Sequence, residues 1–336
     1  MKAIVFDRFG EPDEVLSVRV LADPESGPGE VRARMLFSPI NPSDLLVVRG
    51  RYGVLPKLPA TPGFEGVGVI DKAGPGLLGK LVLGRRVAVL NNRGGNWAEY
   101  AVIPARQAVR IPDDLPDEQI ASFFVNPATV LALVRHELKV PRGEWLLQSA
   151  AGSALGRMII KLGQHDGFLT INVVRRKGAI DEIKSAGADA VISSSEGPIE
   201  DQVRRIVGSS GVKYALDCVG GDVGTALFNS LAPGGRMIVY GTLSNEPIRI
   251  DPRLMIAEKR IVEGFWLGHW MPKLSHGALG IPKALGLFHE IANLIRSGVL
   301  ATETGGVFAL DDIADAARQA EAVGRRGKVL LRIGTK

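Results

Sequence analysis

The stretch that decides the fold is Trp145-Leu146-Leu147-Gln148-Ser149, followed by Ala150-Ala151-Gly152-Ser153-Ala154-Leu155-Gly156. The first five residues are mostly apolar and predict a short strand. The glycine-containing turn then leads into apolar residues at helical spacing over 157–163. A second apolar strand over 169–174 ends in Arg175-Arg176-Lys177. This order of strand, glycine turn, helix and strand predicts a dinucleotide-binding βαβ unit.

The turn and the strand end together indicate which dinucleotide is bound. Gly152 and Gly156 leave room for a phosphate at the helix start, although Ala154 stands where the full fingerprint has its middle glycine. An NAD site places an acidic residue about 20 residues further on, to bind the ribose 2′-hydroxyl. Here Arg175 follows Gly156 by 19 residues, with Arg176 and Lys177 beside it. Because arginine can bind a 2′-phosphate with two donors, the sequence predicts NADPH; the alternative is a solvated basic turn.

The composition is that of an ordinary globular protein. A chain of 336 residues with 46% hydrophobic and 23% charged residues is expected to form two domains. The net charge is +5, but the cations are spread along the chain and aromatic residues make up only 6%, which argues against nucleic-acid binding. The single cysteine, Cys218, allows no intramolecular disulfide, so we expect the reducing cytoplasm. We expect no secretory signal and no membrane span, because the N-terminus reads as a strand and apolar runs are short.

The chain divides into a β-rich part and an α/β part. Within residues 1–117, strand patterns over 30–37, 66–72, 86–90 and 98–103 alternate with Gly/Pro turns, which is typical of a partly closed β domain. From residue 118, helical patterns over 118–124 and 128–138 lead into the βαβ unit. Helices are then predicted at 179–186, 199–207 and 223–231, and strands at 190–192, 214–217 and 236–240. This alternation predicts a parallel, doubly wound sheet. Helices at 281–297 and 311–323 and a strand at 328–333 fit a chain that returns to the first domain.

Several short motifs give the chain a resemblance to a known family. They are Asn41-Pro42-Ser43-Asp44, Arg49-Gly50-Arg51-Tyr52-Gly53, Pro62-Gly63-Phe64-Glu65-Gly66, Asn126-Pro127-Ala128-Thr129, Ile171-Asn172-Val173-Val174-Arg175, Asp217-Cys218-Val219-Gly220-Gly221, Tyr240-Gly241 and Gly264-Phe265-Trp266-Leu267. Over nearly its whole length the chain resembles the zinc-independent medium-chain dehydrogenases/reductases. Within that superfamily it is most similar to the 2-enoyl thioester reductases, and next to the NADPH:quinone reductases.

The resemblance implies an α/β protein of two domains. One is a discontinuous, β-rich, GroES-like catalytic domain over residues 1–117 plus about 270–336. The other is a Rossmann NADPH-binding domain over residues 118–269. The resemblance also implies a homodimer joined through the sheets of the Rossmann domains.

Bound zinc is not expected. Zinc-dependent relatives hold the metal with cysteine and histidine ligands in tetrahedral geometry. Here Phe64 stands in the place of the ligand histidine, and no cysteine precedes it. The five histidines of the chain show no paired spacing.

Without a metal, hydride transfer needs an acceptor that is already polarised, such as an alkene conjugated to a carbonyl group. Hydride from nicotinamide C4 adds to the β-carbon, and the resulting enolate takes a proton at the α-carbon. Tyr52 lies in a turn, and a phenol with a pKa near 10 can supply that proton or bind the enolate oxygen. The resemblance implies that Tyr52 is the catalytic proton donor, because the enoyl reductases have a tyrosine at this place. The alternative is a loop aromatic packed on the core.

The resemblance also implies the residues that bind cofactor and substrate. The expected NADPH contacts are Asn126, Gly152, Ser153, Ala154, Leu155, Arg175, Arg176, Lys177, Tyr240, Gly241, Thr242, Leu243, Phe265, Trp266, Leu267 and Lys328. The expected substrate-pocket residues are Asn41 and Thr129. The alternative role for Phe265 and Trp266 is core packing. We expect Asp217 to cap a strand end and Cys218 to be buried. The residues around His269-Trp270-Met271 match the family poorly and are expected to shape the acyl pocket.

These observations predict an NADPH-dependent oxidoreductase that reduces the C=C bond of an α,β-unsaturated carbonyl compound, with a trans-2-enoyl thioester as the leading substrate. A quinone reductase is the second interpretation, in which Tyr52 would matter less. A non-catalytic NADPH-binding protein, such as a redox sensor, is the third. Each of the two enzyme interpretations requires a small-molecule substrate.

Overall fold

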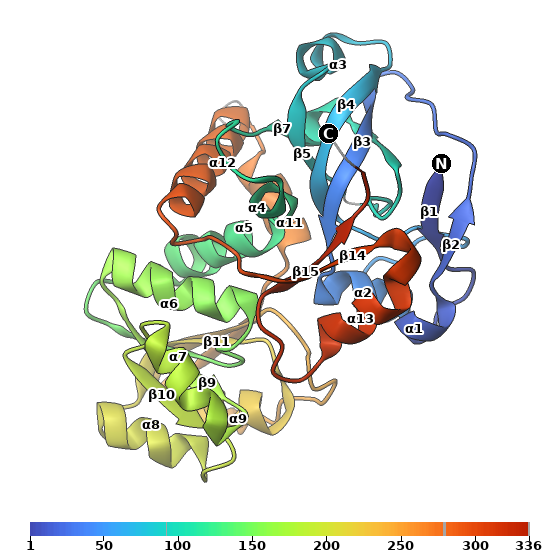
Figure 1. Cartoon of the computed structure of the whole chain (residues 1–336). Helices are drawn as coiled ribbons and strands as arrows, with labels where there is room; N and C mark the ends of the chain where they lie inside the picture. The colour runs from blue at the N-terminus through green and yellow to red at the C-terminus, as the bar shows by residue number, and fades with distance from the viewer. Residues whose placement is uncertain (92, 278–279, 335–336) are drawn as a thin grey trace. The chain divides into compact units, whose positions relative to one another are not determined.

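The computed structural model describes residues 1–91, 93–277 and 280–334 of the chain, which forms two compact units (Figure 1). Unit 1 comprises Met1–Val125, Phe288–Arg296 and the chain from Ala301 onward, and unit 2 comprises Asn126–Leu287 and Ser297–Leu300. These divisions differ from the expected boundaries at 117/118 and about 270. One reason is that the short helix α4 (Asp117–Ala121) packs on the strands of unit 1.

Unit 1 is built on a largely antiparallel sheet, which has seven strands within the described residues. The strand order is β14-β15-β3-β4-β5-β7, and β6 pairs with β3. The strands are β3 (Glu30–Pro39), β4 (Glu65–Ala73), β5 (Arg86–Leu90), β6 (Tyr100–Pro104), β7 (Ala108–Arg110), β14 (Thr304–Ala309) and β15 (Lys328–Arg332). A separate ladder joins β1 (Lys2–Val5) and β2 (Ser17–Val20). Strand β15 lies antiparallel to β3, with Leu331 opposite Ser38, so the C-terminal segment returns to the first domain as predicted.

Short helices cover the core of unit 1. They are α1 (Pro12–Val15), α2 (Pro42–Val48), α3 (Leu77–Val82), η1 (Ala105–Gln107), α4, η4 (Leu310–Asp312) and α13 (Ile313–Glu321). Trp97 is fully buried among residues of β1, α2 and α13, and its indole N–H donates to the carbonyl of Pro39 at 3.3 Å. Gly63 has a φ of +103°, and a Cβ there would lie 2.5 Å from the Trp97 ring. The chain therefore needs glycine where it passes this indole.

Unit 2 contains a parallel sheet of six strands within the described residues, in the order β10-β9-β8-β11-β12-β13. The strands are β8 (Trp145–Gln148), β9 (Leu169–Val174), β10 (Ala190–Ser193), β11 (Val212–Asp217), β12 (Leu231–Val239) and β13 (Ile261–Gly264). Every neighbouring pair is parallel, which confirms the predicted doubly wound sheet. One face of the sheet packs on the hydrophobic core of the unit, and the other face buries a polar group of Gln148, Thr170 and Asn172.

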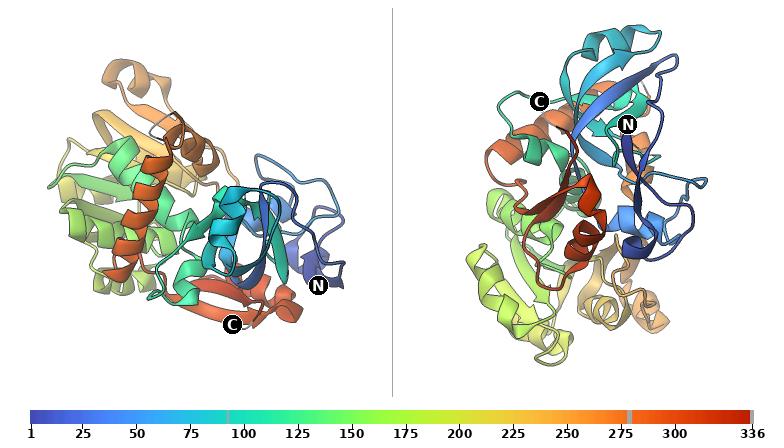
Figure 2. Two further views of the ribbon diagram at one scale, coloured as in Figure 1. Left: turned by 90° about the horizontal axis from the view of Figure 1, so that it is seen from above. Right: turned by 45° about the vertical axis from the view of Figure 1, so that its right-hand side comes forward.

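The helices of unit 2 precede, connect and follow its parallel strands. They are α5 (Val125–Leu131), the π-helix η2 (Ala132–Leu138), α6 (Ala154–Asp166), η3 (Lys177–Ala179), α7 (Ile180–Ser185), α8 (Ile199–Val207), α9 (Gly221–Asn229), α10 (Pro252–Glu258) and α11 (Leu267–Leu274). Helix α12 (Gly280–Arg296) crosses the division between the units. Helices α6 and α7 share one face of the sheet, and α8 contacts α9 on the other (Figures 1 and 2). The helix predicted over 128–138 is α-helical as far as Leu131 and continues as the π-helix η2.

Candidate functional site

The predicted cofactor residues of unit 2 gather where its parallel strands end. Because all these strands run in one direction, their carboxyl ends lie at one edge of the sheet. The chain proceeds from β8 to β9 and β10 on one side, and from β11 to β12 and β13 on the other. Open α/β sheets bind ligands at such a switch point. The ends of β8, β9, β12 and β13 carry Gly152–Leu155, Arg175–Lys177, Tyr240–Leu243 and Phe265–Leu267 respectively.

The turn after β8 leaves space at the start of α6. A Cβ at Gly152 would meet only the Cδ1 atom of Ile183, at 4.0 Å. Ser153 caps the helix, because its Oγ accepts the N–H of Gly156 at 3.0 Å. A Cβ at Gly156 would lie 2.8 Å from the Cα and O atoms of Ala151. Gly156 therefore allows helix and turn to pack closely, whereas Gly152 leaves the open approach that a phosphate requires.

The end of β9 presents three exposed cations. The Lys177 ammonium lies 2.8 Å from a carboxylate oxygen of Glu196, and this contact raises the pKa of Lys177. The carbonyl of Arg175 accepts the Ser193 hydroxyl at 3.3 Å, so the main chain is held while the arginine side chain reaches solvent. This edge has the positive charge that a 2′-phosphate would need.

A strand-end cluster, formed by Ser149, Asp217, Cys218 and Tyr240, lies at the switch point. The buried Asp217 carboxylate accepts the Ser149 hydroxyl at 2.7 Å and the N–H groups of Val219 and Gly220 at 3.0 and 2.9 Å. It caps the strand end, as predicted. Cys218 is 6% exposed, so it is buried, as predicted. Burial raises the pKa of its thiol to about 11. Burial also raises the pKa of Tyr240 well above its ordinary value.

An aromatic group follows β13. The ring of Phe265 lies 6.4 Å from that of Trp270, and Trp266 lies 4.4 Å from His269. His136 also lies 5.3 Å from Trp270. Both predicted aromatic contacts, Phe265 and Trp266, are half-buried within this group.

The remaining predicted residues of unit 2 differ in exposure. Thr242 and Leu243 are exposed in the loop after β12. Asn126 is half-buried and Thr129 is buried, and both lie on α5.

Tyr52 belongs to unit 1 and lies in the loop that follows α2. The loop is tied to the helix by hydrogen bonds from the N–H groups of Gly50 and Arg51 to the carbonyls of Val47 and Leu46. Tyr52 is half-buried, and its ring centroid is 5.5 Å from that of Phe64. Tyr52 packs, together with Phe64, against the hydrophobic core of unit 1, as the alternative interpretation expected, while half-burial leaves part of its side chain accessible.

An acid–lysine cluster is buried in the same unit and comprises Asn41, Asp44, Glu65 and Lys328. The Lys328 ammonium donates to the side-chain oxygen of Asn41, whose amide donates to Glu65 at 3.0 Å. Glu65 also accepts the N–H groups of Phe124 and Val125 at 3.1 and 2.8 Å. The cluster places two carboxylates and one ammonium out of contact with water.

Asn41 and Lys328 are among the site residues expected from the sequence, whereas Asp44 and Glu65 are not. Asp44 could have been found from its spacing, because an acid three residues after a capping asparagine indicates a capping box. Glu65 gave a weaker signal, as an acid at the start of an apolar strand. Lys328 is 2% exposed, so its expected cofactor contact remains a prediction.

Burial is the main cause of the electrostatics of this cluster. It raises the pKa of Asp44 to about 7 and also raises the pKa of Glu65. It lowers the pKa of Lys328 to about 8, although the neighbouring carboxylates act in the opposite direction. The cluster therefore changes charge near neutral pH.

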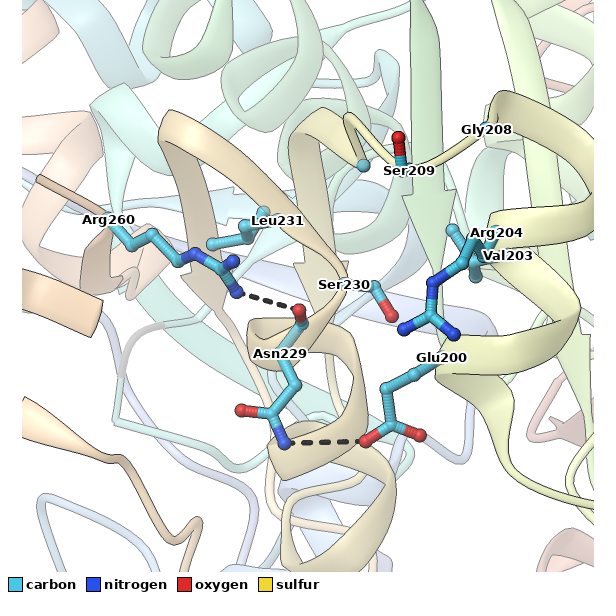
Figure 3. A pocket seen from close by; sticks show the side chains of 10 residues that line it. Glu200, Val203, Arg204, Gly208, Ser209, Asn229, Ser230, Leu231 and Arg260 are labelled. Atoms are coloured by element: carbon cyan, nitrogen blue, oxygen red, sulfur yellow. Dashed lines mark hydrogen bonds between the residues drawn. The ribbon is translucent and has the colours of Figure 1, made fainter. Parts of the chain in front are cut away.

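A small cavity of about 110 Å³ lies far from these strand ends, where β11 and β12 begin (Figure 3). The guanidinium of Arg260 donates to the carbonyls of Phe228 and Asn229 at the end of α9. The amide of Asn229 donates to Glu200 at 3.3 Å. These polar groups cap a helix end, so we assign this cavity no part in the site.

Within residues 1–91, 93–277 and 280–334, no three His, Cys, Asp or Glu side chains lie close enough together to hold a metal ion. None of the helices there is long and apolar enough to cross a membrane.

Comparisons with known proteins agree with this architecture. Residues 27–113 match the alcohol dehydrogenase GroES-like domain, and residues 154–278 match the zinc-binding dehydrogenase domain. The mitochondrial enoyl-[acyl-carrier-protein] reductase of Rattus norvegicus is 32% identical over 316 residues, which cover 93% of this chain and 83% of that protein. The corresponding protein of Arabidopsis thaliana is 32% identical, with 90% of this chain and 80% of that protein covered.

Solved structures give the same result. A putative NADPH:quinone reductase from Bacillus thuringiensis superimposes with a TM-score of 0.91 at 31% identity, covering 98% of each chain. A mycobacterial protein, solved with NADPH, gives 0.86 at 28% identity, covering 99% of this chain and 100% of that one. Its NADPH is the cofactor that the glycine turn and basic strand end of this chain predict. The chain therefore belongs to the medium-chain dehydrogenase/reductase superfamily, an oxidoreductase family whose members similar to it include enoyl reductases and quinone reductases.

Proposed function

We propose that this protein is an NADPH-dependent reductase of the carbon–carbon double bond in an α,β-unsaturated thioester. The observation that carries the proposal is Tyr52, a half-buried phenol in a loop tied to α2. It stands at the place where the enoyl reductases, which the chain resembles, have their proton donor. A quinone acceptor would need no such donor to carbon, so Tyr52 favours the thioester.

Unit 2 holds the cofactor, because its residues fit NADPH. The open space at Gly152 and the backbone N–H groups at the start of α6 suit the pyrophosphate. The exposed guanidinium groups of Arg175 and Arg176 suit the 2′-phosphate, with Lys177 beside them. Ser153, Ala154 and Leu155 complete the turn. When bound, NADPH supplies the hydride that adds to the β-carbon.

The nicotinamide side is assigned to the ends of β12 and β13. Tyr240–Leu243 and Phe265–Leu267 would contact that ring, with Asn126 from α5. The aromatic group around Trp270 would shape the acyl pocket, to which Thr129 contributes. Asn41 in the substrate pocket and Lys328 as a cofactor contact remain part of the proposal, and the two side chains are buried and bonded to each other.

In the proposed reaction NADPH supplies the hydride, and the protein itself donates the proton. After hydride addition the substrate is an enolate, and Tyr52 would donate its hydroxyl proton to the α-carbon. A phenol ordinarily titrates near pH 10, so it keeps this proton at neutral pH and can release it to a stronger base.

We infer the oligomeric state and the cellular location of the protein in part from its family. We infer a homodimer joined at the edge strand β13, where Ile261 is exposed; light scattering of the pure protein measures this directly. The single buried cysteine suits a reducing compartment, and we place the protein in the cytoplasm, although several relatives are mitochondrial. Fractionation of cells, with the protein detected by antibody, would check this assignment.

The test is NADPH oxidation with a trans-2-enoyl-CoA, comparing the wild type with Tyr52→Phe. We expect turnover by the wild type and a loss of about 10²–10⁴-fold in kcat for the variant, because the general acid is removed. NADPH affinity should stay unchanged, which controls for folding. Quinone turnover that is indifferent to Tyr52→Phe would instead establish a quinone reductase. Tight NADPH binding without turnover of either acceptor would indicate a non-catalytic NADPH-binding protein.

A further inference from the structure

We propose that Asp44 is a positioning residue for Tyr52. The inference rests on the proposed function, in which Tyr52 donates the proton. One Asp44 carboxylate oxygen accepts the N–H of Asn41 at 2.8 Å, and the other accepts the N–H of Phe64 at 3.1 Å. The first bond closes the start of α2, whose end leads into the tyrosine loop, and the second holds the residue whose ring packs against Tyr52.

The tyrosine is thus held from two sides by a single side chain. On one side, the capping box sets the direction of α2, and backbone hydrogen bonds tie the loop to the last turn of this helix. On the other side, the Phe64 ring sets one wall of the site that the Tyr52 ring occupies, with 38° between the ring planes. Release of the Asp44 carboxylate would loosen both supports together.

The position requires a carboxylate. Asp44 is buried and meets two N–H donors, so both of its oxygens must act as acceptors. An asparagine would offer one oxygen and one NH₂ group, and the NH₂ group would face a backbone N–H. Asp44→Asn therefore breaks one of the two supports while it conserves the size of the side chain.

The surroundings make this support sensitive to pH. The charged groups that face Asp44 are Glu65 on β4 and Lys328 on β15, and Arg325 acts on Lys328. The pKa of Asp44 is raised to about 7, mainly by burial. Protonation of the carboxylate would turn one acceptor into a donor, so kcat of the wild type should fall as the pH drops through this region. The Asn variant should lose this dependence.

The decisive experiment is a double-mutant cycle on kcat for a trans-2-enoyl-CoA. Asp44→Asn alone should lower kcat about tenfold, with unchanged NADPH affinity. In the Tyr52→Phe background, the same change should have no further effect, because Asp44 acts through the tyrosine. The matched control is Asp251→Asn, another helix-capping aspartate, whose carboxylate accepts the N–H of Arg253 at 2.9 Å in unit 2. An equal loss of kcat in both tyrosine backgrounds would overturn the proposal.

A second measurement does not depend on turnover and separates this inference from the proposed function. The chain has four tyrosines, and tyrosine labelled with ¹³C only at the ring carbon that carries the hydroxyl gives one NMR signal for each. The signal of Tyr52 is identified by its loss in Tyr52→Phe. We expect Asp44→Asn to shift this signal and to leave the other three in place. An unmoved Tyr52 signal would refute the positioning role even if the enzyme reduces thioesters.

A further variant covers the case in which Asp44→Asn fails to fold. Phe64→Leu removes the aromatic wall and leaves the Asp44 carboxylate with both of its donors. It should shift the Tyr52 signal and lower kcat in the wild-type background only. Retention of full kcat and an unshifted signal in Phe64→Leu would contradict the second support.

Discussion

Each unit buries polar side chains next to the strands of its sheet. The units differ in the groups that surround their buried carboxylates. In unit 2, the Asp217 carboxylate is satisfied by one hydroxyl and two backbone N–H groups. In unit 1, Asp44 and Glu65 are buried with the ammonium of Lys328. Asp44 and Glu65 also accept backbone N–H groups, so what distinguishes unit 1 is the buried ammonium beside its two buried acids. Of the two clusters, only this one combines titratable groups of opposite charge in the interior.

The pKa values support this difference. In the strand-end cluster, burial raises the pKa of Cys218 to about 11 and that of Tyr240 well above 10, so both side chains stay neutral in ordinary conditions. In the acid–lysine cluster, the values of Asp44 and Lys328 move toward each other, to about 7 and about 8. Small changes around neutral pH alter the charge of the second cluster, whereas Cys218 and Tyr240 of the first stay neutral.

The largest expected effect comes from removing the ammonium. Lys328→Met should destabilise the protein by about 3–5 kcal/mol, because Glu65 and Asp44 lose the charge that balances them in the interior. Without Lys328, the folded-state pKa values of both carboxyls rise further above their unfolded values. The folded state then binds more protons than the unfolded chain, so the variant should regain stability as the pH falls from 8 to 6. Urea unfolding at several pH values measures this.

Lys213→Met is the control for that experiment. Lys213 is exposed and its ammonium lies 3.6 Å from Glu144, so its loss should cost at most about 1 kcal/mol at any pH. If Lys328→Met is no worse than this control, the buried ammonium does not balance the acids, and the contrast between the two clusters is wrong.

The two clusters also differ in how far the sequence predicts them. The strands and the glycine turn of unit 2 follow from local patterns, and Asp217 and Cys218 lie at the end of such a strand. The acid–lysine cluster depends on a contact between Asn41 and Lys328, which are 287 residues apart. No periodicity reveals that pairing, and the cofactor contact expected of Lys328 comes from the family resemblance alone and stays a prediction. The division between the units was displaced for a similar reason, since it depends on how α4 and α12 pack.

A pair of glycine variants tests whether stability and cofactor binding in unit 2 depend on the space that two glycines leave in the turn after β8. Gly156→Ala should destabilise the protein by about 1–3 kcal/mol, because the new methyl group would lie 2.8 Å from the backbone of Ala151. Gly152→Ala should change stability by less than about 0.5 kcal/mol, since its Cβ meets open space. It should nevertheless weaken NADPH binding, because that space is assigned to the pyrophosphate.

Thermal unfolding and NADPH titration of both variants measure these effects. Since each replaces one glycine by alanine in the same turn, each is the control for the other. Equal losses of stability would show that the turn tolerates no Cβ at either position. Unchanged NADPH affinity in Gly152→Ala would mean that the pyrophosphate does not bind at this turn.

The smallest effect concerns the exposed charges of unit 2, which act on the cofactor rather than on the fold. Arg175→Ala should weaken NADPH binding about tenfold, or about 1.4 kcal/mol, and leave NADH affinity unchanged, because only NADPH carries the 2′-phosphate. Calorimetric titration with both cofactors measures the ratio, and added salt should reduce it, since exposed charges are screened. Arg205→Ala, which removes an exposed arginine from α8, is the matched control and should affect neither cofactor. Equal weakening of NADPH and NADH by Arg175→Ala would mean that the basic strand end does not recognise the 2′-phosphate.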